Sequence, residues 1–234
     1  MERRLEPELL DELPATDPQA VGSRADLRRL NFIMGHAGIL SRAFHRHWVG
    51  IPVPHRPLRV VELGAGDGSL ALELARRWSA LGLTGELTLL DRQNLLSPES
   101  ARAFAALNWS VQVAESEVFD WFGPPSPPVD VMFANLFLHH FAEERLRELL
   151  RLAASRTSLF LACEPRRATL ALTASRWLGL IGCNRVTQHD AVVSVWAGFA
   201  TGELSRCWPG NSGWKLDDRP AGLFSQCFTA QHHG

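Results

Sequence analysis

Glycines stand at every second position after a short apolar run in the stretch 58–68, at Gly64, Gly66 and Gly68, and an acidic residue, Glu62, closes that run. Glycine allows the backbone to turn sharply and lets a ligand approach with no side chain in the way. A helical pattern starts directly after the glycines, so the positive end of a helix and its free N–H groups face the turn. The stretch therefore predicts a strand–turn–helix unit that binds a ligand at its turn.

A second carboxylate follows at the spacing that is typical of a nucleoside site. The apolar run 86–90 ends at Asp91, 23 residues after Gly68. In doubly wound folds, an acidic residue about 20 residues beyond the glycine turn hydrogen-bonds a ribose. The turn and Asp91 together therefore predict a ligand that contains a nucleoside.

Strand-like runs alternate with helical patterns along the middle of the chain. The predicted strands cover 58–64, 86–91, 110–116, 129–135 and 157–163, and the predicted helices cover 68–81, 97–107 and 142–154. This alternation favours a parallel sheet covered by helices on both faces. Two more strand-like runs lie within 213–230. The predicted fold class is therefore α/β.

The chain divides into three predicted parts. Residues 1–23 are polar and contain three prolines, which is typical of a flexible leader. Residues 24–55 are predicted to form an N-terminal helical cap of two helices. Residues 56–234 are predicted to form the core, in which the segment 166–208 replaces the alternation with helices and covers the substrate pocket.

Composition and charge argue against several kinds of partner. The 234 residues carry a net charge of −1, so no overall field attracts nucleic acid or an acidic membrane surface. The N-terminus has no apolar signal-peptide core, and no stretch approaches the ~18 consecutive apolar residues of a spanning helix. We therefore expect a cytoplasmic protein that acts on a small molecule, with no nucleic acid or membrane partner.

The four cysteines do not form a recognisable motif. Cys163, Cys183, Cys207 and Cys227 lie 20 or more residues apart and match neither a zinc pattern nor a compact disulfide framework. We expect free, buried thiols and no metal site.

With these features in hand, the chain resembles the class I S-adenosylmethionine-dependent methyltransferases over residues 56–165. The first motif of that family, acidic-x-Gly-x-Gly-x-Gly, matches residues 62–68. The resemblance implies a Rossmann-like, seven-stranded, mostly parallel sheet with an antiparallel last strand, helices on both faces and an N-terminal helical cap. It also implies S-adenosylmethionine as the cofactor.

The resemblance further implies which residues hold this cofactor. Asp91 would bind the two ribose hydroxyls, while Glu117, with Glu115 as the alternate, would meet the adenine amine. The glycine turn would leave room for the methionyl part, whose ammonium group needs a carboxylate. The implied cofactor-binding residues are Glu62, Gly64, Ala65, Gly66, Gly68, Asp91, Arg92, Glu117, Val118 and Asn135.

Other nucleotide-binding classes match less well. An NAD-binding dehydrogenase carries Gly-x-Gly-x-x-Gly, whereas the third glycine here comes one position early and Glu62 stands at a usually apolar position. Nucleobase and protein-glutamine N-methyltransferases usually carry Asn/Asp-Pro-Pro-aromatic after the fourth strand. This chain instead has Asn135 followed by Leu-Phe-Leu and His139, similar to the small-molecule members of the family.

Methylation of a hydroxyl requires a group that takes up its proton, since a phenol with a pKa of about 10 is mostly neutral at pH 7. Histidine titrates where such help is most useful. The candidate catalytic bases are His139 and His140, which follow the fourth strand, and His189, in the 166–208 segment. Glu164, at the end of the fifth strand, is a further candidate for an acid in the pocket.

Four aromatic residues of the 166–208 segment favour a flat or aliphatic acceptor, although aromatic residues at helical spacing are more often core residues; they are Trp177, Trp196, Phe199 and Trp208. We therefore expect O-methylation of an aromatic or polyketide-like secondary metabolite. Two alternatives stay open. One is C-methylation of a similar acceptor, because an electron-rich ring carbon needs the same geometry, and the other is a non-catalytic scaffold that binds the cofactor.

Overall fold

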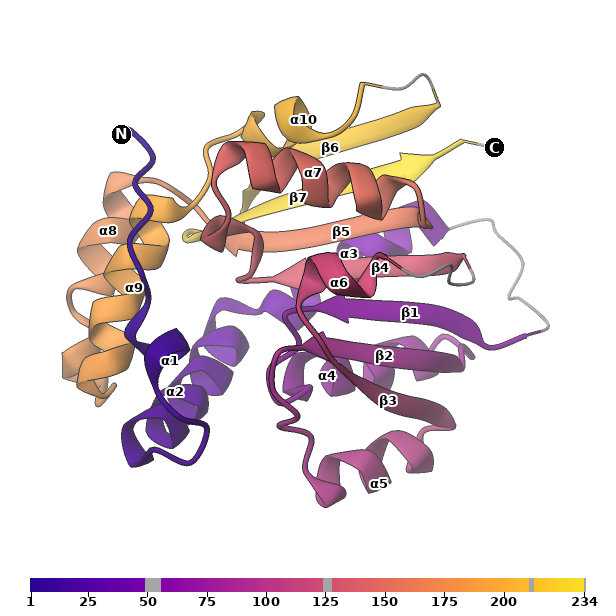
Figure 1. The fold of residues 1–234 in the computed structure, drawn as a ribbon, viewed down its shortest axis with the longest axis horizontal. Helices are drawn as coiled ribbons and strands as arrows, with labels where there is room; N and C mark the ends of the chain where they lie inside the picture. The colour runs from indigo at the N-terminus through magenta and orange to yellow at the C-terminus, as the bar shows by residue number, and fades with distance from the viewer. Residues whose placement is uncertain (49–55, 124–127, 211–212, 234) are drawn as a thin grey trace.

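A computed structural model describes residues 1–48, 56–123, 128–210 and 213–233 of the chain (Figure 1). Its centre is one seven-stranded sheet with the order β3-β2-β1-β4-β5-β7-β6. Six strands point the same way, and β7 runs antiparallel to both of its neighbours. The strands are β1 Leu58–Leu63, β2 Gly85–Asp91, β3 Trp109–Glu115, β4 Val129–Asn135, β5 Thr157–Pro165, β6 Trp214–Ala221 and β7 Ser225–His232. This topology confirms the predicted Rossmann-like fold.

Helices cover both faces of the sheet (Figure 1). One face carries α3 His36–Trp48, α4 Ser69–Ser79 and α5 Pro98–Ala106, and the other carries α6 Val118–Trp121, α7 Glu143–Ala154 and α10 Glu203–Cys207. Successive residues of a strand point to opposite faces, so β1 contributes Val60 to the first apolar layer and Val61 to the second. Both layers are fully buried, and they hold the carboxyl ends of β1 and β4 in place.

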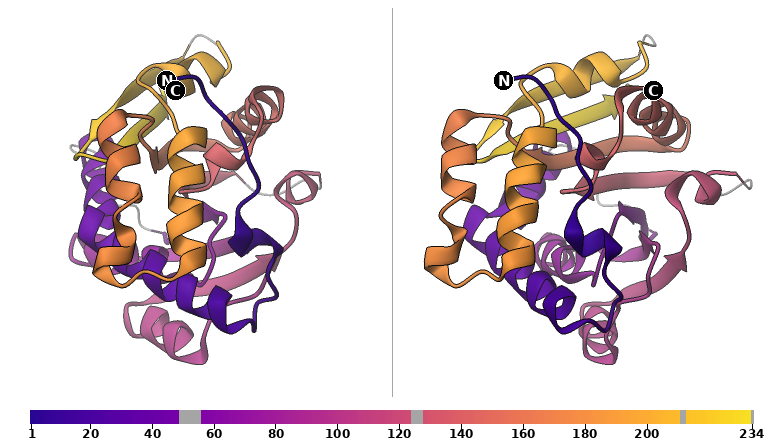
Figure 2. Two further views of the ribbon diagram at one scale, coloured as in Figure 1. Left: turned by 90° about the vertical axis from the view of Figure 1, so that its left-hand side faces the viewer. Right: turned by 60° about the vertical axis from the view of Figure 1, so that its left-hand side comes forward.

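The 3-10 helix η1 Leu138–His140 follows β4. The remaining helices stand beside the carboxyl ends of the parallel strands (Figures 1 and 2). They are α1 Leu9–Glu12, α2 Pro18–Met34, α8 Thr169–Ser175, the 3-10 helix η2 Leu178–Ile181 and α9 Arg185–Ala197. In this group α9 contacts α1, α2 and α8. No helix in the described residues has both the length and the apolar composition that a membrane crossing requires.

The N-terminal region differs from its prediction at two places. Helix α2 begins at Pro18 rather than near residue 23, because Asp17 caps it and proline suits the first helical position. The segment before it contains α1 and contacts α9, so residues 1–23 are packed rather than free in this structure. Of the two cap helices, α3 packs on β5 and β7, whereas α2 packs against α9. Residues 49–55 of the predicted cap lie outside the described residues.

Candidate functional site

The glycine turn joins β1 to α4, and each of its three glycines has a positive φ: 66° at Gly64, 54° at Gly66 and 72° at Gly68. Side chains rarely adopt this conformation. A Cβ atom on Gly64 would also lie 2.2 Å from the ring of Phe137. Within the described part of the chain, a Cβ on Gly66 would meet no atom within 4 Å. The turn is therefore closed at Gly64 and open at Gly66.

Asp91 lies at the end of β2, beside this turn. Its Oδ2 accepts a hydrogen bond from the N–H of Gly66 at 2.8 Å, and its Oδ1 accepts one from Gln93 at 3.0 Å. Two backbone donors thus fix the orientation of the carboxylate, and each oxygen keeps capacity for another donor. A diol at this position would find two acceptors already aligned.

Glu62 is the most unusual residue of the site. Its side chain is 2% exposed, and its Oε2 has no hydrogen-bond partner among the described residues. Burial raises the pKa of this carboxyl well above its usual range, and the nearby charges of Asp67 and Asp91 raise it further. A buried carboxyl without a partner is costly. It would be stabilised by a cationic N–H donor that enters the site.

These groups surround one cavity of about 350 Å³ at the carboxyl ends of β1, β2 and β4. This is where ligands bind in open α/β sheets, at the point where the strand order reverses. Nine of the ten predicted cofactor residues line it: Glu62, Gly64, Ala65, Gly66, Asp91, Arg92, Glu117, Val118 and Asn135. Gly68 is outside the lining, and a Cβ there would lie 2.7 Å from Leu89. Its glycine is thus explained by packing and by its positive φ.

Two of the predicted cofactor residues, Asn135 and Glu117, lie at the edges of the cavity. Asn135 donates to Asn31 at 3.3 Å, and its own Oδ1 has no hydrogen-bond partner in the described ranges. Glu117 precedes α6 at the rim of the cavity, while Glu115 is exposed and is not one of the lining residues described. The structure thus brings Glu117 to the cavity rather than its alternate.

Glu164 is fully buried and holds the loop after β4 rather than lining the cavity. Its Oε1 accepts hydrogen bonds from the N–H groups of Phe137 and Leu138 at 3.0 and 2.9 Å. Its Oε2 lies 2.8 Å from Nδ1 of His139. One carboxylate therefore orders the backbone of this loop and the ring of His139.

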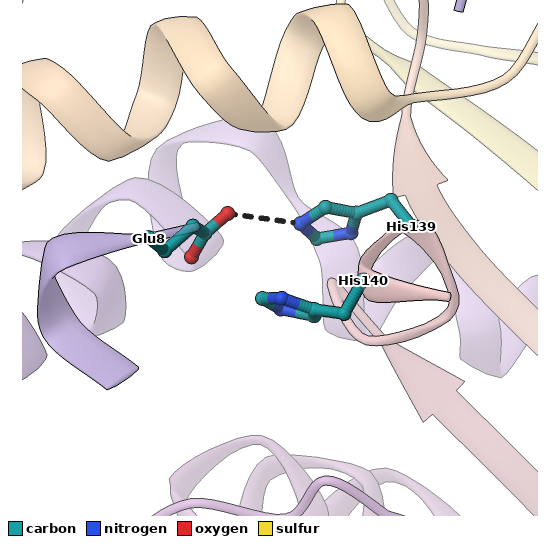
Figure 3. Close-up of side chains that lie close together, drawn as sticks. All are labelled: Glu8, His139 and His140. Atoms are coloured by element: carbon teal, nitrogen blue, oxygen red, sulfur yellow. Dashed lines mark hydrogen bonds and ion pairs between the residues drawn. The ribbon is translucent and has the colours of Figure 1, made fainter. Parts of the chain in front are cut away.

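The other ring nitrogen of His139 meets the N-terminal segment, because Nε2 lies 3.1 Å from Oε1 of Glu8 (Figure 3). Burial opposes a charge on His139, but the hydrogen bonds to Glu164 and Glu8 outweigh it and raise the pKa of the ring to about 9. Burial would likewise raise the pKa of Glu8, yet the bond to His139 and the charge of that ring lower it to about 2. His139 is therefore a cation at pH 7 and cannot take up a proton there.

His140 has the opposite electrostatic environment. Its half-buried ring lines the cavity, 4.3 Å between centroids from the ring of His139. Burial lowers the pKa of His140, and the charged His139 lowers it further. Its Nδ1 lies 3.5 Å from Asp11. Of the two neighbouring histidines, His140 is the one that is neutral at pH 7 and can act as a base.

His189 does not reach the cavity. It lies on α9 with 45% of its side chain exposed, hydrogen-bonded to Asp190 at 2.8 Å, and it is not among the described residues that line the site. The structure thus brings together two of the three predicted bases.

The four aromatic residues of the 166–208 segment are not among the described residues that line the cavity. Trp177 is 60% exposed, and Trp196 packs beside the small apolar cluster of α8 and α9. Phe199 and Trp208 are buried in the main core. The aromatic rings that line the cavity come instead from the loop after β4, at Phe137 and Phe141.

Several lining residues carried no sequence signal. Arg28 of α2 pairs with Asp67 of the glycine turn at 2.6 Å. Glu8, Leu10 and Asp11 reach the cavity from the N-terminal segment. These three residues lie in a polar stretch of the sequence without periodicity, so only the tertiary structure reveals their position.

Comparison with known proteins fits this geometry. Residues 60–157 match the family model described as "Methyltransferase domain". Over these residues the chain is therefore similar to methyltransferase domains. Trans-aconitate 2-methyltransferase from Rhodococcus jostii is 36% identical over 95 residues, which make up 41% of this chain. The match spans about a third (32%) of that relative's length.

Solved structures share the fold of this chain. An O-methyltransferase family protein from Burkholderia thailandensis has a TM-score of 0.58 at 21% identity, covering 94% of this chain and 61% of its own. The plantazolicin methyltransferase BamL, in complex with a triazolic desmethylPZN analog and SAH, has a TM-score of 0.64 at 12% identity. That alignment covers 96% of this chain and 93% of BamL. At such identities the likeness shows the shared fold.

One group at the edge of the cavity has the composition of a metal site. Glu8, His139 and His140 bring potential ligand atoms within 4.8 Å of one another (Figure 3). Two imidazoles and a carboxylate suit zinc or manganese. However, Nε2 of His139 and Oε1 of Glu8 are bonded directly to each other. We therefore interpret these residues as a hydrogen-bonded ion pair with a neighbouring neutral imidazole.

Proposed function

We propose that this protein is an S-adenosylmethionine-dependent methyltransferase that O-methylates a small aromatic or polyketide-like molecule. The observation that carries the proposal is the buried carboxyl of Glu62, whose Oε2 has no partner among the described residues, beside an open glycine turn. A ligand that brings an ammonium group and a ribose fits this arrangement. The BamL structure, which contains SAH, supports the same choice of cofactor.

Each part of the cofactor has a matching group in the cavity. Glu62 would accept hydrogen bonds from the ammonium group, and Asp91 would accept them from the two ribose hydroxyls as strong, charge-assisted bonds. Glu117 at the rim would receive the adenine amine. Gly66 leaves space for the methionyl part. When bound, the cofactor supplies an activated methyl group on a sulfonium, whose leaving group is a neutral thioether.

The chain's own contribution to catalysis is to position the acceptor and to remove its proton. Phe137 and Phe141 provide flat apolar walls, and His140 lies beside them in the lining. A neutral His140 would take the proton of an acceptor hydroxyl as that oxygen attacks the methyl group. Alignment of the two reactants can lower the barrier by up to ~7–11 kcal/mol in favourable cases.

Two measurements test the proposal. Calorimetry with S-adenosylhomocysteine and with NAD should detect binding of the first and not of the second. Transfer of a labelled methyl group to a panel of phenols and polyketide-like phenolics should then give an O-methylated product. A C-methylated product would favour the carbon-methylation alternative, and binding without any transfer would favour a scaffold. Binding of NAD alone would overturn the proposal.

A further inference from the structure

The first twelve residues follow a defined path along the edge of the site. Figure 2 shows the N-terminal segment running down beside α9 before it turns into α1 and α2. The guanidinium of Arg3 donates to the carbonyl oxygens of Ala197, His139 and Phe141 at 2.7, 3.1 and 3.0 Å. The backbone N–H of Arg4 donates to the carbonyl oxygen of Trp196 at 3.1 Å. The segment is thereby tied both to α9 and to the loop that carries the histidines.

The start of helix α1 is hydrogen-bonded to one carboxylate of α9. Asp190 of α9 accepts hydrogen bonds from the N–H groups of Leu9 and Leu10, at 2.8 and 2.9 Å, through its two oxygens. In the described structure, none of the four residues of α1 is buried. The contacts found for this segment are therefore largely polar. Regions with little buried apolar surface open at low free energy.

Beyond this anchor, the segment reaches into the cavity. Glu8 bonds both His139 and the hydroxyl of Ser194. Asp11 lies 3.3 Å from Arg92, which follows β2, and 3.5 Å from His140. The segment thus extends from α9 to the end of β2, across the opening between them. Glu8, Leu10 and Asp11 form part of the cavity wall, so the site is incomplete without them.

We propose that residues 3–12 form a strap that closes over the methyl-transfer site, and that Glu8 is a positioning residue for the reaction. Closure places Glu8 on Nε2 of His139, which engages both nitrogens of that ring and leaves His140 as the histidine that faces the acceptor. Opening of the strap exposes Asp91 and the glycine turn, so that cofactor and product can exchange. This inference rests on the proposed function.

The closure is tested by amide hydrogen exchange on the full-length protein, with and without S-adenosylhomocysteine. The N–H groups of Leu9 and Leu10 report directly on the strap, because they donate to Asp190. We expect their exchange to slow at least several-fold when S-adenosylhomocysteine is bound. We also expect Asp190→Asn to remove most of that protection. If these two amides exchange equally fast with and without S-adenosylhomocysteine, the proposal of a closing strap is wrong.

The role of Glu8 is tested by Glu8→Gln, with Glu6→Gln as the matched control. Glu6 is an exposed acid on the same segment, so its variant makes the same charge change away from the cavity. Loss of one charge-assisted hydrogen bond to His139 should lower kcat roughly ten- to hundredfold. The affinity for S-adenosylhomocysteine should stay within about threefold of the wild type, because Glu62 and Asp91 are unchanged.

The outcomes separate this inference from the proposed function. If the wild type does not bind S-adenosylhomocysteine, the proposed function fails. If the wild type binds it and transfers methyl groups, while Glu8→Gln retains full kcat, Glu8 is not a positioning residue. A parallel loss of kcat and cofactor affinity would mean a general structural role for Glu8, which also contradicts the inference.

Discussion

At the scale of the residue, Glu62 places ligand binding in conflict with stability. Its pKa is raised by burial, so the folded protein disfavours the ionised form. Such a group destabilises the fold increasingly as the pH rises above about 4.3–4.5, by about 1.4 kcal/mol per unit until its folded pKa is reached. A cationic donor in the cavity would stabilise the carboxylate.

Glu62→Gln should therefore stabilise the ligand-free protein at pH 7 and weaken binding of S-adenosylhomocysteine. Removing a buried, unpaired ionisable group should raise the free energy of unfolding by roughly 1–3 kcal/mol. Thermal melting and calorimetry check both effects, and Glu144→Gln on the exposed start of α7 is the control. Wild-type binding should also release a proton, so affinity should rise with pH. A destabilised variant that binds normally would contradict this view.

His140 should determine how the rate depends on pH. Burial and the charge of His139 lower the pKa of His140 below the usual histidine value of about 6.5. The ring is therefore neutral at pH 7 and becomes protonated only at a pH below about 6.5. We expect the rate with a phenol acceptor to fall only in that acidic range. His140→Gln should lose about 100- to 10,000-fold in kcat, the usual contribution of a general base. His189→Gln, on the exposed side of α9, should retain the wild-type rate profile.

The glycines of the turn should differ in what they contribute. Gly64→Ala would bring a methyl group within 2.2 Å of Phe137, in addition to the strain of a positive φ. Gly66→Ala carries only that strain, roughly 1–2 kcal/mol, but its methyl group would enter the cavity. Urea unfolding should show the larger loss of stability for Gly64→Ala. Calorimetry should show that Gly66→Ala folds yet loses at least about tenfold in cofactor affinity.

At the scale of the element, the loop after β4 depends on Glu164 of β5. This carboxylate accepts two backbone N–H groups and the Nδ1 proton of His139. Pairing between β4 and β5 brings it to the loop, as Asn135 lies opposite Cys163 in the parallel register. The geometry of the histidines is thus set by a strand that carries none of the predicted cofactor residues.

Glu164→Ala should disorder this loop and spare the cofactor site. Each buried N–H left without an acceptor costs roughly 1–3 kcal/mol, so the melting temperature and kcat should both fall. Affinity for S-adenosylhomocysteine should change only a few-fold, because Glu62 and Asp91 lie on β1 and β2. Glu164→Gln keeps one carbonyl oxygen for the two amides and should recover most of the lost stability. A Glu164→Ala variant that melts like the wild type would refute this role.

At the scale of the whole molecule, the cavity lies where the sheet, the cap helices and the strap meet. A ligand there contacts segments far apart in the chain, so its binding should stabilise the fold as a unit. At 100 times its Kd, S-adenosylhomocysteine should add about 2.7 kcal/mol. For a domain of this size that corresponds to a rise in Tm of roughly 5–11 °C. Differential scanning fluorimetry measures it, with NAD as the ligand that should give no shift.

The sheet and the turn were predictable from the sequence, and nine of the ten residues predicted to hold the cofactor line the cavity. These features depend on contacts between near neighbours, such as strand–helix alternation and glycines with positive φ at 64, 66 and 68. Asp91 was predictable for the same reason, since the end of β2 and the turn belong to one β–α–β unit. A local sequence pattern is enough to predict a site when the residues of that site belong to one short β–α–β unit.

Which histidine can act as a base, and what closes the site, depends on contacts between distant parts of the chain. His139 is charged because Glu164, 25 residues away, and Glu8, 131 residues away, meet its two nitrogens. Contacts between residues so far apart in the sequence produce no periodic pattern, and the polar segment around Glu8 resembles a flexible leader. The protonation state of a buried ring depends on which charges surround it in space, and folding alone brings those charges together.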